Sequence, residues 1–109
     1  MVKQKIKVYI AAPYTSPDPC VNTNIAMKVA NNLMNMGYYP YLPHLTHFFH
    51  TAHPRPKEDW YELDKEFLKV CDVVWRLKGE SKGADEEVKL AKELKIPVVY
   101  SIGELKKYK

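Results

Sequence analysis

The chain has 109 residues, 46% of them hydrophobic, and its 17 basic and 13 acidic side chains leave a formal net charge of +4. This length supports one hydrophobic core and excludes two independently folded domains. The basic residues are scattered from Lys3 to Lys109, a pattern that favours a small anionic partner or plain solubility and weighs against nucleic acid. Cys20 and Cys71 form no CxxC pair, and the chain shows neither a signal peptide nor a run of about 18 apolar residues. We therefore expect a cytoplasmic protein that has no membrane partner.

Predicted strands and helices alternate along the chain. Apolar runs and period-two alternation predict four strands, at residues 6–12, 38–42, 72–77 and 96–101. Pro40 places the second strand at an edge of the sheet. Helical spacing of apolar residues predicts three helices, at about residues 18–36, 59–70 and 84–95. The apolar stripe expected on the first of them consists of Val21, Ile25, Val29, Leu33 and Met36. The first helix begins at Asp18, which precedes a proline, or is capped by Asn22 or Thr23.

This alternation is typical of parallel sheets with right-handed crossovers. The sequence therefore predicts an α/β fold with one domain over residues 1–109. We expect a Rossmann-like or flavodoxin-like three-layer sandwich with a parallel sheet of about 4–5 strands. Such sheets bind ligands outside the carboxyl ends of their strands, near the point where strand order reverses. The candidate site loops are therefore those that follow Ile10, Leu42 and Leu77.

Two adjacent glutamates begin the helix expected at residues 84–95. The apolar side chains of this helix form one stripe on a helical wheel, namely Ala84, Val88, Ala91 and Leu94. Glu87 falls within about 45° of the centre of this stripe, whereas Glu86 points about 145° away. We expect Glu87 to face the interior and Glu86 to face water. A capping role for Glu87 is the alternative, because the first turn of a helix favours a carboxylate.

The helix expected at residues 59–70 contains a second misplaced charge, because Asp64 falls inside its apolar stripe. An ionised carboxylate buried without partners costs several kcal/mol. One explanation is an ion pair with a buried lysine or with Arg76. The other is that Asp64 and Glu87 share one dry cleft, where two carboxyl groups can hold different pKa values. One can then act as an ionised nucleophile and the other as a protonated acid, as retaining glycosyl transfer requires.

The loop GESKG, at residues 79–83, is a candidate anion site. Ser81 and the backbone N–H groups around Gly83 stand at a helix N-terminus and could receive a phosphate. The P-loop pattern GxxxxGK[ST] is absent, and a simple helix cap is the alternative interpretation.

Four histidines recur every third residue, at His44, His47, His50 and His53. A three-residue step rotates each side chain by about 60° on an α-helix, so the four do not converge on one point. No HExxH pairing occurs either. We expect no metal site, and we expect one or two of these histidines to line the pocket.

Four segments in this order and spacing resemble the nucleoside 2-deoxyribosyltransferase-like superfamily, especially its short members: VYIAAPYTS, PHLTHF, DWYELDKEFLKVCDVVWRL and SKGADEEVKLAKELKIPVV. The superfamily also includes 2'-deoxynucleoside 5'-phosphate N-hydrolases. The resemblance covers nearly the whole chain. It implies cleavage or transfer of the N-glycosidic bond of a (deoxy)nucleoside or nucleoside 5'-monophosphate through a covalent glycosyl-glutamate intermediate. It also implies a homodimer or higher homo-oligomer and no cofactor.

The resemblance assigns roles to single residues. The family nucleophile is a glutamate six residues after a polar residue, which matches Ser81 and Glu87 and implies that Glu87 attacks the anomeric carbon C1'. A serine at the first of these positions is similar to the N-hydrolases, where it contacts the 5'-phosphate, whereas nucleoside transferases carry an aspartate. Asp64, eight residues before Asp72, matches the acid that assists protonation of the departing base. Tyr9 matches the tyrosine that orients the glutamate.

The expected substrate-binding residues surround these groups, namely Ala12, Tyr14, His44, Trp60, Ser81 and Gly83. The chain departs from the family in the loop after the first strand, where Ala11-Ala12-Pro13 lacks the usual glycine, and in its short C-terminal segment GELKKYK. Two other function classes stay open. One is a non-catalytic nucleotide-binding or sensing module with the same pocket, and the other is a histidine-dependent metal hydrolase.

Overall fold

Four short strands lie in the middle of the structure, a computed structural model that describes residues 6–108. They are β1 (Lys7–Ala11), β2 (Tyr39–Tyr41), β3 (Val73–Arg76) and β4 (Val98–Val99). All neighbouring strands are parallel, and their order is β2-β1-β3-β4. The predicted parallel sheet and the edge position of β2 are therefore confirmed. Residues 1–5 and 109 of the predicted domain lie outside the described residues.

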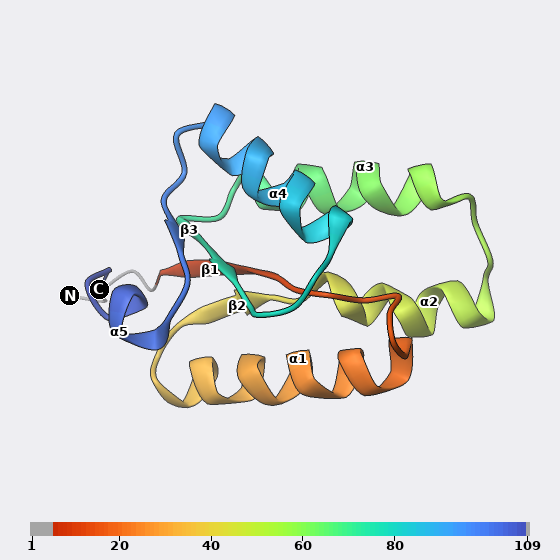
Figure 1. Cartoon of the computed structure of the whole chain (residues 1–109), viewed down its shortest axis with the longest axis horizontal. Helices are drawn as coiled ribbons and strands as arrows, with labels where there is room; N and C mark the ends of the chain where they lie inside the picture. The colour runs from red at the N-terminus through yellow and green to blue at the C-terminus, as the bar shows by residue number, and fades with distance from the viewer. Residues whose placement is uncertain (1–5, 109) are drawn as a thin grey trace.

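Helices cover both faces of this sheet and complete the predicted three layers (Figure 1). They are α1 (Pro19–Asn35), the 3₁₀ turn η1 (Pro43–Leu45), α2 (Thr46–Ala52), α3 (Lys57–Leu68), α4 (Lys82–Glu93) and α5 (Ile102–Leu105). Residues 43–56, where no helix was predicted, thus contain η1 and α2, and α5 was not expected either. Within the described residues, no helix is long and apolar enough to cross a membrane.

The side chains of β1 divide the core into two halves, because successive residues of a strand point to opposite faces. Val8 and Ile10 pack with Leu33 of α1 and Leu105 of α5 on one face. On the other face, one cluster joins β1 to the region of α3 and α4, namely Tyr9, Ala11, Leu68, Cys71, Val74, Ala84 and Ala91. Since β1 is buried on both sides, it holds Tyr9 rigidly beneath the two helices that carry the candidate carboxylates.

The first helix begins at the predicted Asp18–Pro19 step. The Asp18 carboxylate accepts hydrogen bonds from the backbone N–H groups of Cys20 and Val21, at 2.8 and 3.1 Å. These bonds satisfy helix N–H groups that otherwise have no acceptor. Asn22 is buried further along the helix, where its side chain donates to the carbonyl oxygens of Tyr14 and Ser16. The start of α1 is thereby tied to the loop after β1.

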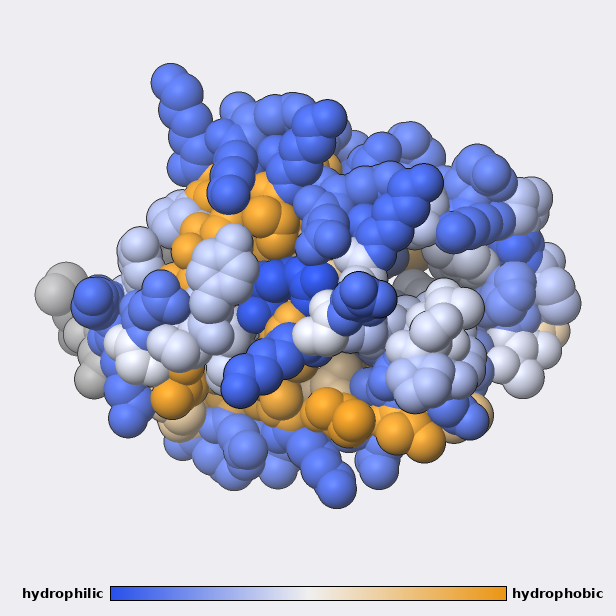
Figure 2. Space-filling view, viewed as in Figure 1, coloured by the Kyte–Doolittle hydropathy of each residue, from blue (hydrophilic) through white to orange (hydrophobic). Residues whose placement is uncertain are grey.

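The apolar stripe expected on α1 is wrong at three positions. Val21, Ile25 and Met36 are 52%, 51% and 42% exposed, and apolar side chains form a band over α1 in Figure 2. Leu33 of the expected stripe is buried as predicted, and the other buried residues of α1 are instead Asn22, Thr23 and Ala26. Two rows that differ by one residue have the same helical spacing. The row that contains Asn22 and Ala26 packs against the sheet because Ala26 is small and the Asn22 amide is hydrogen-bonded.

Candidate active site

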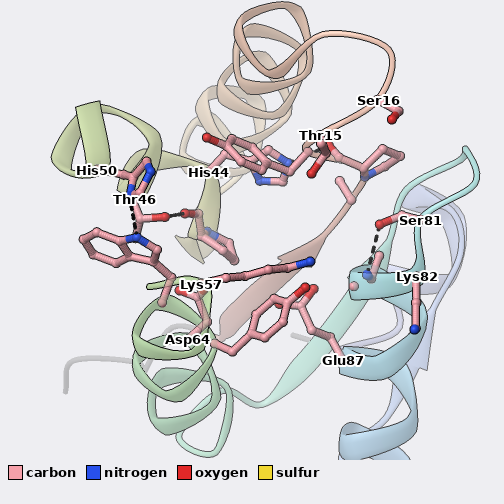
Figure 3. A pocket seen from close by; sticks show the side chains of 18 of the residues that line it. Thr15, Ser16, His44, Thr46, His50, Lys57, Asp64, Ser81, Lys82 and Glu87 are labelled. Atoms are coloured by element: carbon pink, nitrogen blue, oxygen red, sulfur yellow. Dashed lines mark hydrogen bonds between the residues drawn. The ribbon is translucent and has the colours of Figure 1, made fainter. Parts of the chain in front are cut away.

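A cavity of about 930 Å³ opens at the carboxyl end of the sheet (Figure 3). Its walls come from the loop after β1, the η1–α2 segment, α3 and the first turns of α4. The chain runs from β1 to β2 on one side and returns to β3 on the other, so strand order reverses between β1 and β3. This is the place where open α/β sheets bind ligands.

The cavity contains eight of the nine residues predicted from the sequence to bind or transform a substrate. They are Ala12, Tyr14, His44, Trp60, Asp64, Ser81, Gly83 and Glu87. The ninth, Tyr9, is fully buried beneath the cavity. Residues from four segments of the chain therefore meet at one cavity.

Glu87 points from α4 toward the sheet, and the Tyr9 hydroxyl donates a hydrogen bond to its carboxylate. Glu86 is exposed on the opposite face, which confirms the orientation predicted from the helical wheel. Glu87 does not cap α4, because Ser81 does so by accepting a hydrogen bond from the Ala84 N–H group at 3.1 Å. The Glu87 carboxyl group is thus available to the cavity.

Asp64 faces the same cavity from α3. The Tyr41 hydroxyl donates a hydrogen bond to its carboxyl oxygen over 3.2 Å. Tyr41 and Tyr9 are register partners on β2 and β1, and their rings stack with centroids 5.5 Å apart. Two neighbouring tyrosines therefore hold two carboxyl groups from different helices. The suggested ion pair between Asp64 and Arg76 is wrong, because Arg76 pairs with exposed Asp85 at 3.0 Å.

Both carboxyl groups hold protons more tightly than free side chains do. Burial raises the pKa of Glu87 to about 8, and the nearby charge of Asp64 acts in the same direction, while Tyr9 and Arg76 oppose it. Burial also raises the pKa of Asp64 to about 7, against the effect of the Tyr41 hydrogen bond. Near neutral pH, each of the two groups can therefore gain or lose a proton with little change in free energy.

The raised pKa of Glu87 implies a pH-dependent cost in stability. A carboxyl group whose folded-state pKa exceeds its ordinary value of 4.5 stabilises the fold below pH 4.5 and loses this contribution as pH rises through about 8. We expect Glu87→Gln to be more stable than the wild type, with an advantage that grows by about 3 kcal/mol between about pH 6 and pH 9. Thermal melts at both pH values measure this difference.

The matched control for this prediction is Glu86→Gln, since Glu86 is exposed next to Glu87. Its melting temperature is expected to follow that of the wild type at both pH values. An advantage of Glu87→Gln that stays constant with pH would contradict the assignment of a raised pKa to Glu87.

The loop before α4 is held in one shape by two contacts. Arg76 donates to the Gly79 carbonyl oxygen at 2.8 Å and to Asp85 at 3.0 Å. Gly79 has φ +117, and a Cβ at this position would lie 2.8 Å from Pro13 Cγ. Only glycine fits this conformation without strain. The close approach fixes Ser81 and the N-terminus of α4 against the loop that follows β1.

Residues 6–101 match the family described as Domain of unknown function (DUF7768). The chain belongs to this family. No curated protein matches the sequence of this chain.

Solved structures of two enzymes share the fold of this DUF7768 member. The 2-deoxyribosyltransferase from Bacillus psychrosaccharolyticus has a TM-score of 0.62 and 19% identity, over 84% of this chain and 69% of that one. The corresponding enzyme from Leishmania mexicana has a TM-score of 0.65 and 16% identity, over 87% of this chain and 63% of that one. The chain thus spans less than two thirds of the length of the Leishmania enzyme. These matches confirm the predicted fold class.

The histidines of this DUF7768 domain have separate partners. His44 is buried and its Nε2 lies 2.8 Å from the Pro13 carbonyl oxygen, to which it donates. His47 bonds to the Tyr14 hydroxyl at 2.7 Å, and His53 packs its ring on Phe49. Over residues 6–108, no group of three or more His, Cys, Asp or Glu side chains is placed to hold a metal ion. Only His44 and His50 line the cavity.

Several cavity residues were missed by the sequence analysis, including His50, Lys57 and Tyr61. Helix α3 begins at Lys57, two residues earlier than expected, which adds Lys57 to the face of the helix that carries Asp64. Tyr41 was missed as well, because it lies behind Asp64 instead of in the cavity wall. The alternation in YYPYL was the available signal, since Tyr39 and Tyr41 fall on one face of an edge strand.

Proposed function

We propose that this domain cleaves or transfers the N-glycosidic bond of a (deoxy)nucleoside or nucleoside 5'-monophosphate. One observation carries the proposal: two carboxyl groups with raised pKa values, Glu87 and Asp64, line one cavity and are held by a stacked tyrosine pair. The fold shared with two 2-deoxyribosyltransferases supports it. The chemistry requires one carboxylate and one carboxylic acid on either side of the scissile bond.

In the first step, a Glu87 carboxylate oxygen forms a bond to C1' while the bond from C1' to the base nitrogen breaks. Asp64 donates its proton to the departing base. In the second step, water or another base attacks C1', Asp64 takes up the proton, and Glu87 is released. The Tyr9 hydroxyl orients the Glu87 carboxylate throughout, and Ala12 and Tyr14 line the wall on the β1 side.

The other end of the substrate is expected at the N-terminus of α4. Ser81, Lys82 and Gly83 line the cavity there, where free N–H groups and the lysine favour a phosphate or the 5' hydroxyl. Homo-oligomeric assembly and a cytoplasmic location belong to the same proposal. The exposed apolar side chains of Val21 and Ile25 on α1 support the assembly.

The rival function is a binding or sensing module that has the same pocket and no turnover. A panel of nucleosides and nucleoside 5'-monophosphates, in ribose and deoxyribose forms, separates the two when free base is measured by chromatography. We expect free base from at least one substrate, and the presence or absence of a second base as acceptor distinguishes transfer from hydrolysis. Tight binding without release of base from any substrate would support the sensor instead.

The pH dependence of the reaction follows from the two pKa values. The attacking Glu87 must be ionised, so kcat/KM falls as pH drops below about 8. Asp64 must be protonated, so kcat/KM also falls as pH rises above about 7. We expect a bell-shaped profile with its maximum between about pH 7 and 8, whose two apparent pKa values belong to the coupled pair. A profile that is flat from pH 5 to about 9 would contradict this pairing of acid and nucleophile.

A further inference from the structure

The hydrogen bonds of His50 fix the position of its proton. Its Nδ1 atom accepts from the Trp60 indole N–H at 2.8 Å and lies 3.3 Å from the backbone N–H of Arg55. An indole N–H and a peptide N–H can only donate, so Nδ1 carries no proton. The neutral imidazole therefore carries its proton on Nε2, which leaves His50 as a hydrogen-bond donor of defined position.

This donor belongs to an aromatic wall of the cavity. His50 lies on α2, at the edge of the cavity in Figure 3, and Trp60 of α3 also lines this cavity. Phe49 supports the indole from behind, with ring centroids 4.9 Å apart in an edge-on arrangement. The His50 and Trp60 rings are also perpendicular, at 5.8 Å and 82°. The wall thus combines a flat apolar surface with a single donor, which suits a planar heterocycle.

The position of this wall relative to the two carboxyl groups sets the orientation of a substrate. Trp60 precedes Asp64 by four residues, so the two side chains lie one turn apart on one face of α3. Glu87 and Gly83 are on α4 and Ser81 caps its N-terminus, and this end of α4 forms another wall of the cavity. An acid that protonates the leaving base must lie beside that base. The base therefore lies along α3, and the sugar lies toward α4.

We propose that His50 and Trp60 form the nucleobase subsite, in which the base packs on the indole and accepts a hydrogen bond from His50 Nε2. The orientation of the base rests on the proposed function, whereas binding of a free base requires no turnover. The base must present an acceptor, either a ring nitrogen or a carbonyl oxygen, on the edge that faces α2. His50 thereby selects among bases by the atom at that edge.

The test measures binding of free nucleobases to the 109-residue chain. Trp60 and Trp75 are its two tryptophans, and Trp75 packs against the core. In a Trp75→Phe background, the fluorescence of Trp60 alone reports binding of adenine, guanine, hypoxanthine, cytosine, thymine and uracil. We expect a saturable change with at least one base. His50→Phe, which has no donor, is expected to raise the Kd of that base about tenfold.

His50→Gln is the matched variant, because its amide oxygen can accept from Trp60 while its NH₂ group donates to the base. We expect it to bind within about threefold of the parent protein. Deaza or deoxo analogues of the bound base, which lack one acceptor each, provide a second measurement. One of them should lose affinity for the parent protein and lose none for His50→Phe. Thermal melts establish that the variants are folded.

Three results would overturn the subsite: no base changes the fluorescence of Trp60, His50→Phe binds as the parent does, or His50→Gln is as weak as His50→Phe. Its failure is distinguishable from failure of the proposed function. If bases bind in the expected pattern but the protein cleaves no glycosidic bond, the subsite is supported and the proposed function is contradicted. If the protein cleaves nucleosides and kcat/KM is unchanged in His50→Phe, the proposed function is supported and the subsite is contradicted.

Discussion

Glu87→Ala is expected to abolish release of base, with kcat reduced on the order of 10⁴-fold or more. The variant lacks the carboxylate that forms the bond to C1'. The methyl group of alanine is not a nucleophile and cannot accept the hydrogen bond from Tyr9. The measurement is free base released per enzyme in the panel assay, followed by mass spectrometry of acid-quenched wild-type protein to detect a glycosyl adduct on Glu87.

Glu86→Ala provides the control for this loss. Glu86 carries the same side chain as Glu87 at the adjacent position, but it faces solvent. We expect its kcat to stay within about twofold of the wild type, as for other exposed substitutions away from the site. If Glu86→Ala abolished turnover and Glu87→Ala did not, the nucleophile would have been assigned to the wrong residue.

Asp64→Asn is expected to lower kcat/KM by about 10²–10⁴-fold, the usual contribution of a positioned general acid. Asparagine keeps the size of the side chain and can still accept the hydrogen bond from Tyr41, so the fold of the site is retained. The decline of activity at alkaline pH is also expected to disappear, since that limb reports ionisation of Asp64. The acid limb, which reports Glu87, is expected to remain.

A substrate whose leaving group needs no proton separates acid catalysis from damage to the site. With 4-nitrophenyl 2-deoxyriboside, the loss caused by Asp64→Asn should shrink to about tenfold or less, because nitrophenolate departs without protonation. Glu62→Gln, on the exposed face of the same helix, is the control and should leave both substrates unaffected. An equal loss with both leaving groups would show that Asp64 acts on binding or structure instead of on the proton.

Periodicity within single helices was sufficient to find both carboxyl groups. Glu87 and Asp64 stood out because each interrupts an apolar stripe, and the structure turns both toward the cavity. The same reasoning was wrong for α1, where Val21 and Ile25 are exposed. Adjacent rows of a helix have equal spacing, and the row that packs inward depends on contacts made elsewhere. In α1, the bonds from Asn22 to the loop after β1 fix that choice.

The partners of the functional groups could not be read from the sequence. Tyr41 meets Asp64 only because β2 aligns with β1 in a register that pairs Tyr41 with Tyr9. His50 meets Trp60 only because α2 turns back over the start of α3. The alternation in YYPYL places Tyr41 on one face of its strand, but it does not give the partner of Tyr41. Both contacts depend on how whole elements are placed.

The sequence by itself determined the α/β alternation, Asp18 as one candidate start of α1 and the inward positions of Glu87 and Asp64. These features follow from interactions within a few residues, such as capping and hydrophobic spacing. Only the tertiary structure decided that two stacked tyrosines hold the two carboxyl groups and that burial raises both of their pKa values. Strand register and crossover geometry bring distant residues together and exclude water from them, and neither is encoded within any single segment.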